Sequence, residues 1–158
     1  MCIRDSPEKI SEEVYRGGRD AVMQAYTGAA INSASEIDWF GLYDCFPICF
    51  IRAVEAVGLA SRGGGGAWVQ DMYNATSETY RPHEFQVNTH GGLLALGAPW
   101  EVPAMYSIIE ALRQLEGSAS ESQQLQSCNR ALVYGNGGIL THTAVAILGT
   151  EQTVEAQL

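Results

Sequence analysis

A short segment with an imidazole, an amide and a glycine pair is the part of the chain best equipped for chemistry. It spans residues 88–99 and places Asn88 two positions before His90, which Gly91 and Gly92 follow directly. An imidazole can transfer a proton near neutral pH, and glycines let backbone N–H groups approach a ligand closely. We therefore predict that His90 is a catalytic base or oxyanion donor and that Asn88, Gly91 and Gly92 contact the substrate. The alternative is a structural histidine that ties the loop to backbone carbonyls.

Two further loops carry phenols. Tyr43 ends one apolar run and precedes Asp44, and Tyr134 ends another before a glycine-rich stretch. Phenols donate to and accept from hydroxyl and carbonyl oxygens, and we predict that the Tyr43 and Tyr134 loops converge with the His90 loop to form one site. The residues predicted to bind substrate beside Tyr134 are Asn136, Gly137 and Gly138. The alternatives are tyrosines that end strands with their hydroxyls in water and asparagines that form turns. Asp44 is predicted to cap the helix that follows it.

Helices and strands alternate around these loops, which indicates an α/β layer fold. The predicted helices are 11–26, 48–57 after Pro47, a short one beginning at 93–96, and 103–116. The predicted strands are 37–43, 85–88, 130–134 and 139–148, the last two joined as a hairpin by a turn at 135–138. In the helix at 103–116, the residues on the predicted apolar face are Ile108, Ile109, Leu112 and Leu115. The stretch 62–66 is predicted to be a mobile surface loop and 68–82 an irregular excursion.

Composition excludes several function classes. The 158 residues suggest one domain, and 46% hydrophobic with 17% charged residues is typical of a globular chain. A net charge of −9 disfavours nucleic-acid binding, which needs clustered Lys and Arg. No apolar run reaches the ~20 residues that span a bilayer. The four cysteines lack CxxC spacing, so we expect reduced thiols in a cytoplasmic protein and no metal site. Cys45 and Cys49 are predicted to be small core residues.

The three loops, in this order, resemble motifs of the C-terminal half of the thiolase superfamily, and most closely its sterol-carrier/lipid-transfer type. Tyr43-Asp44-Cys45-Phe46 resembles Asn-Glu-Ala-Phe of common thiolases and His-Asp-Cys-Phe of the sterol-carrier type. The segment 88–99 resembles the Asn-x-x-Gly-Gly … Gly-His-Pro loop. The stretch 131–138 resembles the strand and turn that carry Cys-x-Gly-Gly-Gly. The similarity spans 7–149, with 1–6 expected to be a foreign leader and 150–158 a frayed tail.

This resemblance implies a specific architecture. The family fold is a duplicated five-layer α-β-α-β-α arrangement, and this chain would supply one half, a mixed sheet covered by helices. The nucleophilic cysteine lies in the other, N-terminal half, so the chain alone is expected to be inactive. Family members pair through that other half, which implies a homodimer. The substrate implied is a coenzyme A thioester, such as an acetyl-CoA acetyltransferase uses, with no bound cofactor.

Departures from the family motifs imply a change of chemistry. Ala98 stands where thiolases have the histidine of Gly-His-Pro, Tyr134 replaces the second catalytic cysteine, and Tyr43 replaces an Asn or His. A thiol-to-phenol change raises the reference pKa from about 8.5 to about 10. The resemblance therefore implies Tyr43, His90 and Tyr134 as the catalytic residues, and two phenols with one imidazole suit retro-aldol cleavage of a β-hydroxyacyl-CoA. Thiolase-like aldolases that shorten steroid side chains have such sites and work with an OB-fold partner bearing a zinc ribbon. The alternative is a non-catalytic acyl-CoA- or sterol-binding subunit.

Overall fold

A three-stranded mixed sheet lies between two helical layers in the computed structural model, which describes residues 7–75, 85–99, 102–137 and 142–150. β1 (Trp39–Leu42) pairs in parallel with β2 (Arg130–Gly137), and β2 pairs in antiparallel fashion with β3 (His142–Gly149). The segment around Val87 adds a parallel bridge to Phe40 on the other side of β1. The predicted α/β fold and mixed sheet are confirmed.

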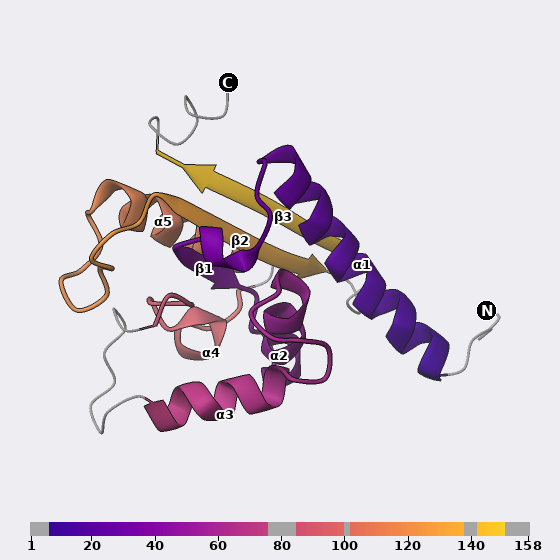
Figure 1. The fold of residues 1–158 in the computed structure, drawn as a ribbon. Coiled ribbons are helices and arrows are strands. Elements are labelled where there is room, and N and C mark those ends of the chain that lie inside the picture. The colour runs from indigo at the N-terminus through magenta and orange to yellow at the C-terminus, as the bar shows by residue number, and fades with distance from the viewer. Residues whose placement is uncertain (1–6, 76–84, 100–101, 138–141, 151–158) are drawn as a thin grey trace.

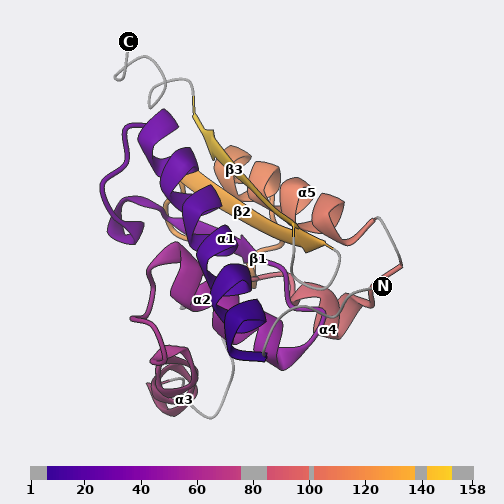
Figure 2. The ribbon, with the colours of Figure 1, turned by 90° about the vertical axis from the view of Figure 1, so that its right-hand side faces the viewer.

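The two faces of the sheet have different helical covers. α1 (Pro7–Gly28) and α2 (Pro47–Val57) cover the face that carries Phe40, Leu42, Leu132 and Tyr134. α5 (Pro103–Glu116) covers the opposite face, with Trp39, Ala131 and Val133. Figure 2 shows α5 on one side of the sheet and α1 with α2 on the other. A residue's position along β1 or β2 therefore decides which layer its side chain joins.

The helix boundaries follow simple local signals. Pro47 and Pro103 occupy the first turns of α2 and α5, where their missing N–H groups are not needed. Gly58 and Gly117 end these helices in the left-handed conformation that glycine adopts at least cost. The bounds of α5 match the prediction, whereas α1 begins at Pro7, before the predicted cap Ser11. The short elements are η1 (Ala34–Glu36) and α4 (Gly92–Leu96).

The predicted loop at 62–66 and the predicted irregular stretch at 68–82 are partly wrong, because α3 (Gly65–Ala75) includes the last two residues of the loop and 68–75 of the stretch. The Gly65 N–H donates to the Glu55 carboxylate at 3.0 Å, which anchors the start of α3 on α2. Trp68 packs against the core and meets the Phe85 ring edge-on at 6.2 Å. Figure 1 shows α3 beside α2 and apart from the sheet. The residues 76–82 of the predicted excursion lie outside the described part of the chain.

The hairpin also differs from its prediction. β2 continues to Gly137, which pairs with His142, so the predicted turn residues 135–137 belong to the strand. Gly138 lies outside the described residues, as does the start of the predicted second strand. The extension places Gly135 opposite Ala144 and Asn136 opposite Thr143, in a paired strand and not in a turn.

The buried face of α5 is more polar than predicted. Ile109 and Leu112 are each 42% exposed, and the residues buried on this helix include Ser107, Glu110 and Gln114. Ile108 and Leu115 pack at the edge of the core, as predicted. Gly41 explains part of this arrangement, because a Cβ there would lie 2.8 Å from the Ser107 Cβ. α5 thus lies close to the sheet through small and polar side chains.

Gly18 sets the distance between α1 and the sheet. A Cβ at Gly18 would lie 2.6 Å from the Tyr134 hydroxyl, whereas a Cβ at Gly17 would have nothing within 4 Å. Gly18→Ala is therefore expected to lower the free energy of unfolding by roughly 1–3 kcal/mol. Gly17→Ala, the control, is expected to raise it by up to about 1 kcal/mol through helix propensity. Urea denaturation measures both. Adding Tyr134→Phe should restore most of the Gly18→Ala loss, and additive effects would contradict the contact.

Candidate functional site

The three loops meet at the carboxyl end of β1. Leu42 is paired with Tyr134, and the Tyr43 N–H donates to the Tyr134 carbonyl at 3.0 Å. On the other side, the Leu42 N–H donates to Asn88 Oδ1 at 2.8 Å, and Asn88 Nδ2 donates to the Leu42 carbonyl at 2.9 Å. The predicted convergence of the three segments is therefore what the structure shows.

Asn88 hydrogen-bonds through its side chain to the edge of β1. Its backbone has φ of 48°, a left-handed conformation that asparagine tolerates better than most residues. Its side-chain amide bonds to both backbone groups of Leu42, as a neighbouring strand would. This amide therefore positions the loop that carries His90, and its contact with a substrate stays a prediction.

Asp44 caps α4, and the prediction that it caps the helix following it is wrong. The N-cap residue of α2 is Phe46, which makes no side-chain capping bond. Asp44 is buried, and its Oδ1 accepts the Leu93 N–H at 2.7 Å. Gly92, with φ of 64°, lies directly against this carboxylate, in the space that a Cβ would fill. The close approach that Gly92 permits is thus to Asp44 of the same chain.

His90 presents an imidazole with no hydrogen-bond partner among the described residues. Both ring nitrogens are buried, and the ring lies 6.1 Å from the Trp39 ring at 42°. Burial lowers the pKa of His90, while the charges of Glu110 and Asp44 oppose that shift. The neutral ring offers one donor and one acceptor. No carbonyl of the described residues accepts from it, so the structural alternative, a ring tied to carbonyls, is not what is observed.

A buried polar network beside His90 was missed at the sequence level. The Thr89 hydroxyl accepts from Trp39 Nε1 at 2.9 Å and from Gln114 Nε2 at 3.2 Å, and donates to Glu110 at 2.9 Å. Glu110 also accepts from Gln114 at 2.9 Å. The signal available was the spacing of Ser107, Glu110 and Gln114, which places three polar residues on one face of an amphipathic helix. This network fixes the residue that directly precedes His90.

The two tyrosines lie on the α1–α2 side of the sheet. Tyr134 packs in that core beside Leu132, and burial raises its pKa although Thr143 and Arg52 oppose the shift. Burial likewise raises the pKa of Tyr43, with smaller contributions from Cys45, Cys49 and Asp44. Both phenols are therefore protonated at neutral pH. The structure brings together the backbones of the predicted catalytic residues, but the Tyr134 ring and the His90 ring face opposite layers.

The remaining predicted substrate-binding residues lie near the end of β2. The Asn136 Oδ1 is buried and has no hydrogen-bond partner among the residues described. Gly137 is exposed and paired with His142, and Gly138 is outside the described residues. Asn136 is thus a free acceptor for a donor group of a ligand, whereas the contacts of Gly91, Gly92 and Gly137 with a substrate stay predictions.

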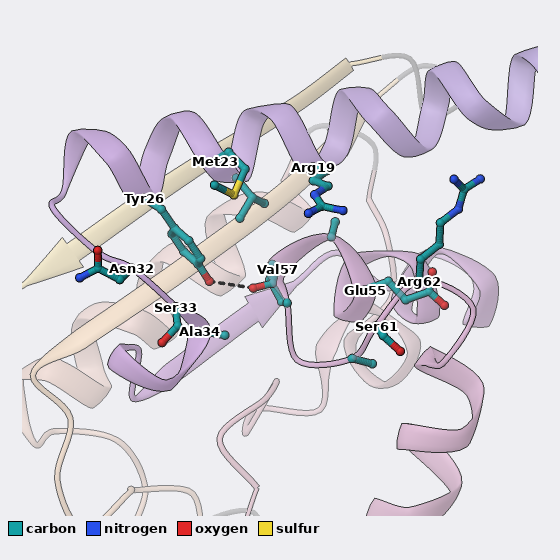
Figure 3. A pocket seen from close by; sticks show the side chains of 14 residues that line it. Arg19, Met23, Tyr26, Asn32, Ser33, Ala34, Glu55, Val57, Ser61 and Arg62 are labelled. Carbon is teal, nitrogen blue, oxygen red and sulfur yellow. Dashed lines mark hydrogen bonds between the residues drawn. The ribbon is translucent and has the colours of Figure 1, made fainter.

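A separate cavity of about 400 Å³ lies between the second half of α1 and the end of α2. Figure 3 shows Arg19, Met23 and Tyr26 on the α1 wall, with the Tyr26 hydroxyl donating to the Val57 carbonyl at 2.8 Å. Burial raises the pKa of Tyr26 to about 12. None of the predicted site residues lines this cavity. The pocket therefore lies apart from the three converging loops.

The described residues contain neither a metal-binding cluster nor a membrane-spanning helix. No group of three or more His, Cys, Asp or Glu side chains is arranged there to hold a metal ion. No helix within the described ranges combines the length and hydropathy needed to cross a bilayer.

His90 should make the stability of the fold depend on acidity. Its pKa is lowered in the folded state, so the unfolded chain binds this proton more tightly. The stabilising contribution is complete above the unfolded pKa of about 6.5 and is lost as the pH falls below it. Between about pH 7 and 5, the wild-type free energy of unfolding should fall more steeply than that of His90→Gln. Urea denaturation at each pH measures both, and parallel profiles would rule out a shifted His90.

Comparisons with known proteins agree on one relationship. A family model described as "Thiolase C-terminal domain-like" matches residues 6–150. An acetyl-CoA acetyltransferase of Methanothermobacter thermautotrophicus is 31% identical over 112 residues, covering 71% of this chain and 28% of the relative. Sterol carrier protein 2 of Rattus norvegicus is 30% identical over 127 residues, covering 77% and 22%. A solved structure named Ltp2-ChsH2(DUF35) aldolase superposes with a TM-score of 0.66 at 24% identity, covering 87% of this chain and 32% of that chain.

Proposed function

The chain belongs to the thiolase C-terminal domain-like family, and from this membership we propose that it is the C-terminal domain of an acyl-CoA enzyme that makes or breaks a C–C bond. The proposed substrates are lipid or steroid acyl-CoA thioesters, and the proposed chemistry is of the aldol type. The observation that carries the proposal is His90. Its buried, neutral ring has two nitrogens without partners, and it lies where the three loops converge.

In the proposed retro-aldol step, His90 accepts the proton of the β-hydroxyl group of a β-hydroxyacyl-CoA. The Cα–Cβ bond breaks, the β-carbon becomes a carbonyl, and its electron pair forms an enolate at the thioester. A hydrogen-bond donor stabilises the enolate oxygen before the α-carbon is reprotonated. Tyr43 is the donor proposed for this role, because the charge of Asp44 acts on both Tyr43 and His90. Tyr134 contributes if its ring turns toward the same space.

The proposal depends on the rest of a longer protein. The chain spans only 28% and 22% of the two curated relatives, so the activity of the whole protein is inferred. We place the nucleophile-bearing half elsewhere in that protein and propose a cytoplasmic homodimer. An OB-fold partner with a zinc ribbon is proposed to assist it. Ala98 at the position of the family histidine favours aldol chemistry over thiolysis, because a methyl group transfers no proton.

A non-catalytic subunit that binds acyl-CoA or sterol is the second candidate. The observation that favours it is the orientation of Tyr134, whose ring packs in the α1–α2 core away from His90. Ala98 and Tyr134 stand where the family has its catalytic histidine and second cysteine, and Tyr134 and His90 lie on opposite faces of the sheet. These changes impair catalysis more than they impair binding. The relationship to sterol carrier protein 2 is consistent with this candidate.

The test is to express the complete reading frame with any adjacent OB-fold gene product and to assay cleavage of a β-hydroxyacyl-CoA panel by product mass. His90→Ala is expected to lower kcat roughly 10²–10⁴-fold while acyl-CoA binding persists. His142→Ala, on the exposed part of β3, is the control and should retain wild-type turnover. Unchanged turnover in both His90→Ala and Tyr134→Phe would contradict the residue assignment. Tight acyl-CoA binding without product would favour the second candidate.

A further inference from the structure

Cys45 and Cys49 form a pair of thiols where the Tyr43 loop meets the start of α2. Their sulfur atoms are 3.5 Å apart, with the Cys45 thiol donating to Cys49 Sγ, and neither is in a disulfide. Cys45 precedes the N-cap residue Phe46, so it stands outside the helical hydrogen-bond ladder. Cys49 lies in the first helical turn, and its N–H donates to the Phe46 carbonyl at 2.9 Å. One thiol of the pair is therefore fixed by the helix and the other can rotate toward it.

We propose that Cys45 and Cys49 are a reversible modification site that forms an intramolecular disulfide by exchange with a low-molecular-weight disulfide such as oxidised glutathione. The half-buried Cys45 thiolate attacks one glutathione sulfur, forms a mixed disulfide and releases the first glutathione thiolate. The Cys49 thiolate then attacks the Cys45 sulfur and releases the second. The protein loses two protons and two electrons, and one oxidised glutathione becomes two reduced molecules.

The geometry favours ring closure at this pair. A disulfide requires the sulfurs to approach to about 2.05 Å, and Cys45 can supply this movement by rotation about its side-chain bonds. Cys49 is 6% exposed, so it reaches a bulky reagent poorly but meets the neighbouring Cys45 sulfur directly. Burial raises the pKa of Cys45 to about 11, so exchange at neutral pH is expected to be slow. The position of the equilibrium is therefore the quantity to measure.

Cys128 provides a contrast within the same chain. It is 8% exposed, no other cysteine contacts it among the described residues, and burial raises its pKa to about 12. Its Sγ is directed to the Arg130 carbonyl at 4.0 Å. We therefore expect Cys128 to remain a thiol in the folded protein under conditions that oxidise the pair.

The test equilibrates the 158-residue chain in glutathione buffers of increasing oxidation, followed by alkylation and trypsin digestion. The peptide Asp20–Arg52 contains Cys45 and Cys49 and neither of the other cysteines. It should lose the mass of two hydrogen atoms and resist alkylation, and a reductant should restore both thiols. In Cys49→Ser, glutathione bound to Cys45 should accumulate at least roughly tenfold over wild type, because the neighbouring thiol no longer displaces it. Cys128→Ser should behave as wild type.

Two results would overturn the proposal. One is a wild-type peptide that keeps both thiols over the whole buffer range, and the other is a peptide that stops at the mixed disulfide. A measurement on the wild-type chain alone guards against a misfolded variant. The equilibrium constant for the disulfide should be at least roughly tenfold larger in the folded chain than in urea, because the fold holds the sulfurs together. Equal constants would show that the fold contributes nothing.

Discussion

Gly92→Ala is expected to lower the free energy of unfolding by roughly 3–5 kcal/mol. Alanine at this position would have to adopt φ of 64°, and its methyl group would occupy the space of the Asp44 carboxylate. Asp44 would have to move, which breaks its bond to the Leu93 N–H and leaves a buried carboxylate short of a donor. Urea denaturation followed by circular dichroism measures the loss.

Gly117→Ala is the matched control for this effect. Gly117 has φ of 67°, and a Cβ there would have nothing within 4 Å. Its substitution should cost only the roughly 1–2 kcal/mol of left-handed backbone strain. The difference between the two variants isolates the contact between Gly92 and Asp44. Equal losses in both variants would mean that Asp44 adjusts freely and that its capping bond matters little.

Thr89→Val should destabilise the fold by roughly 3–5 kcal/mol, although the side-chain volume hardly changes. The hydroxyl accepts from Trp39 Nε1 and Gln114 and donates to Glu110, and all four residues are buried. Replacing it by a methyl group leaves the buried Trp39 N–H without its acceptor and removes one of the two donors to Glu110, while Gln114 keeps Glu110 and the Gln123 carbonyl as acceptors. The measurement is again the free energy of unfolding in urea, compared with wild type under identical buffer conditions.

Thr89→Ser separates the hydroxyl from the methyl group. It retains every hydrogen bond of the network and removes one methyl group, so a loss of about 0.5–1.5 kcal/mol is expected. If Thr89→Ser is as damaging as Thr89→Val, packing rather than hydrogen bonding holds the network together. The same pair tests the site, because Thr89 directly precedes His90.

Local signals were enough to predict α5 and the convergence of the loops. Pro103 and Gly117 mark the start and the end of α5 by backbone chemistry alone. The polar residues after the apolar run at 37–43 were predicted to share one site with the other two loops, and the structure brings the three segments together at the end of β1. The bounds of α5 are determined by residues close to one another in the chain, whereas the convergence is made by contacts such as Asn88 with Leu42, 46 positions apart.

The errors concern residues whose partners are distant in sequence. Asp44 is of a residue type that often caps the helix following it, yet its carboxylate accepts the N–H of Leu93, 49 positions away. α3 depends on Glu55 and Phe85, and a run of glycines gives no sign of either contact. The Tyr134 and His90 rings also lie on opposite faces of the sheet, and the order of the motifs in the sequence does not reveal this.

The pairing of β1 has a consequence for the order in which the chain can fold. Asp38, just before β1, accepts the N–H of Arg130 at 3.0 Å, and these residues are 92 positions apart. The other neighbour of β1, near Val87, also lies far along the chain. Contacts of such long range are closed late, since much chain entropy is lost before they form. During synthesis, the edge of β1 that pairs with β2 therefore stays open until β2 leaves the ribosome, and an open strand edge exposes the chain to aggregation during this interval.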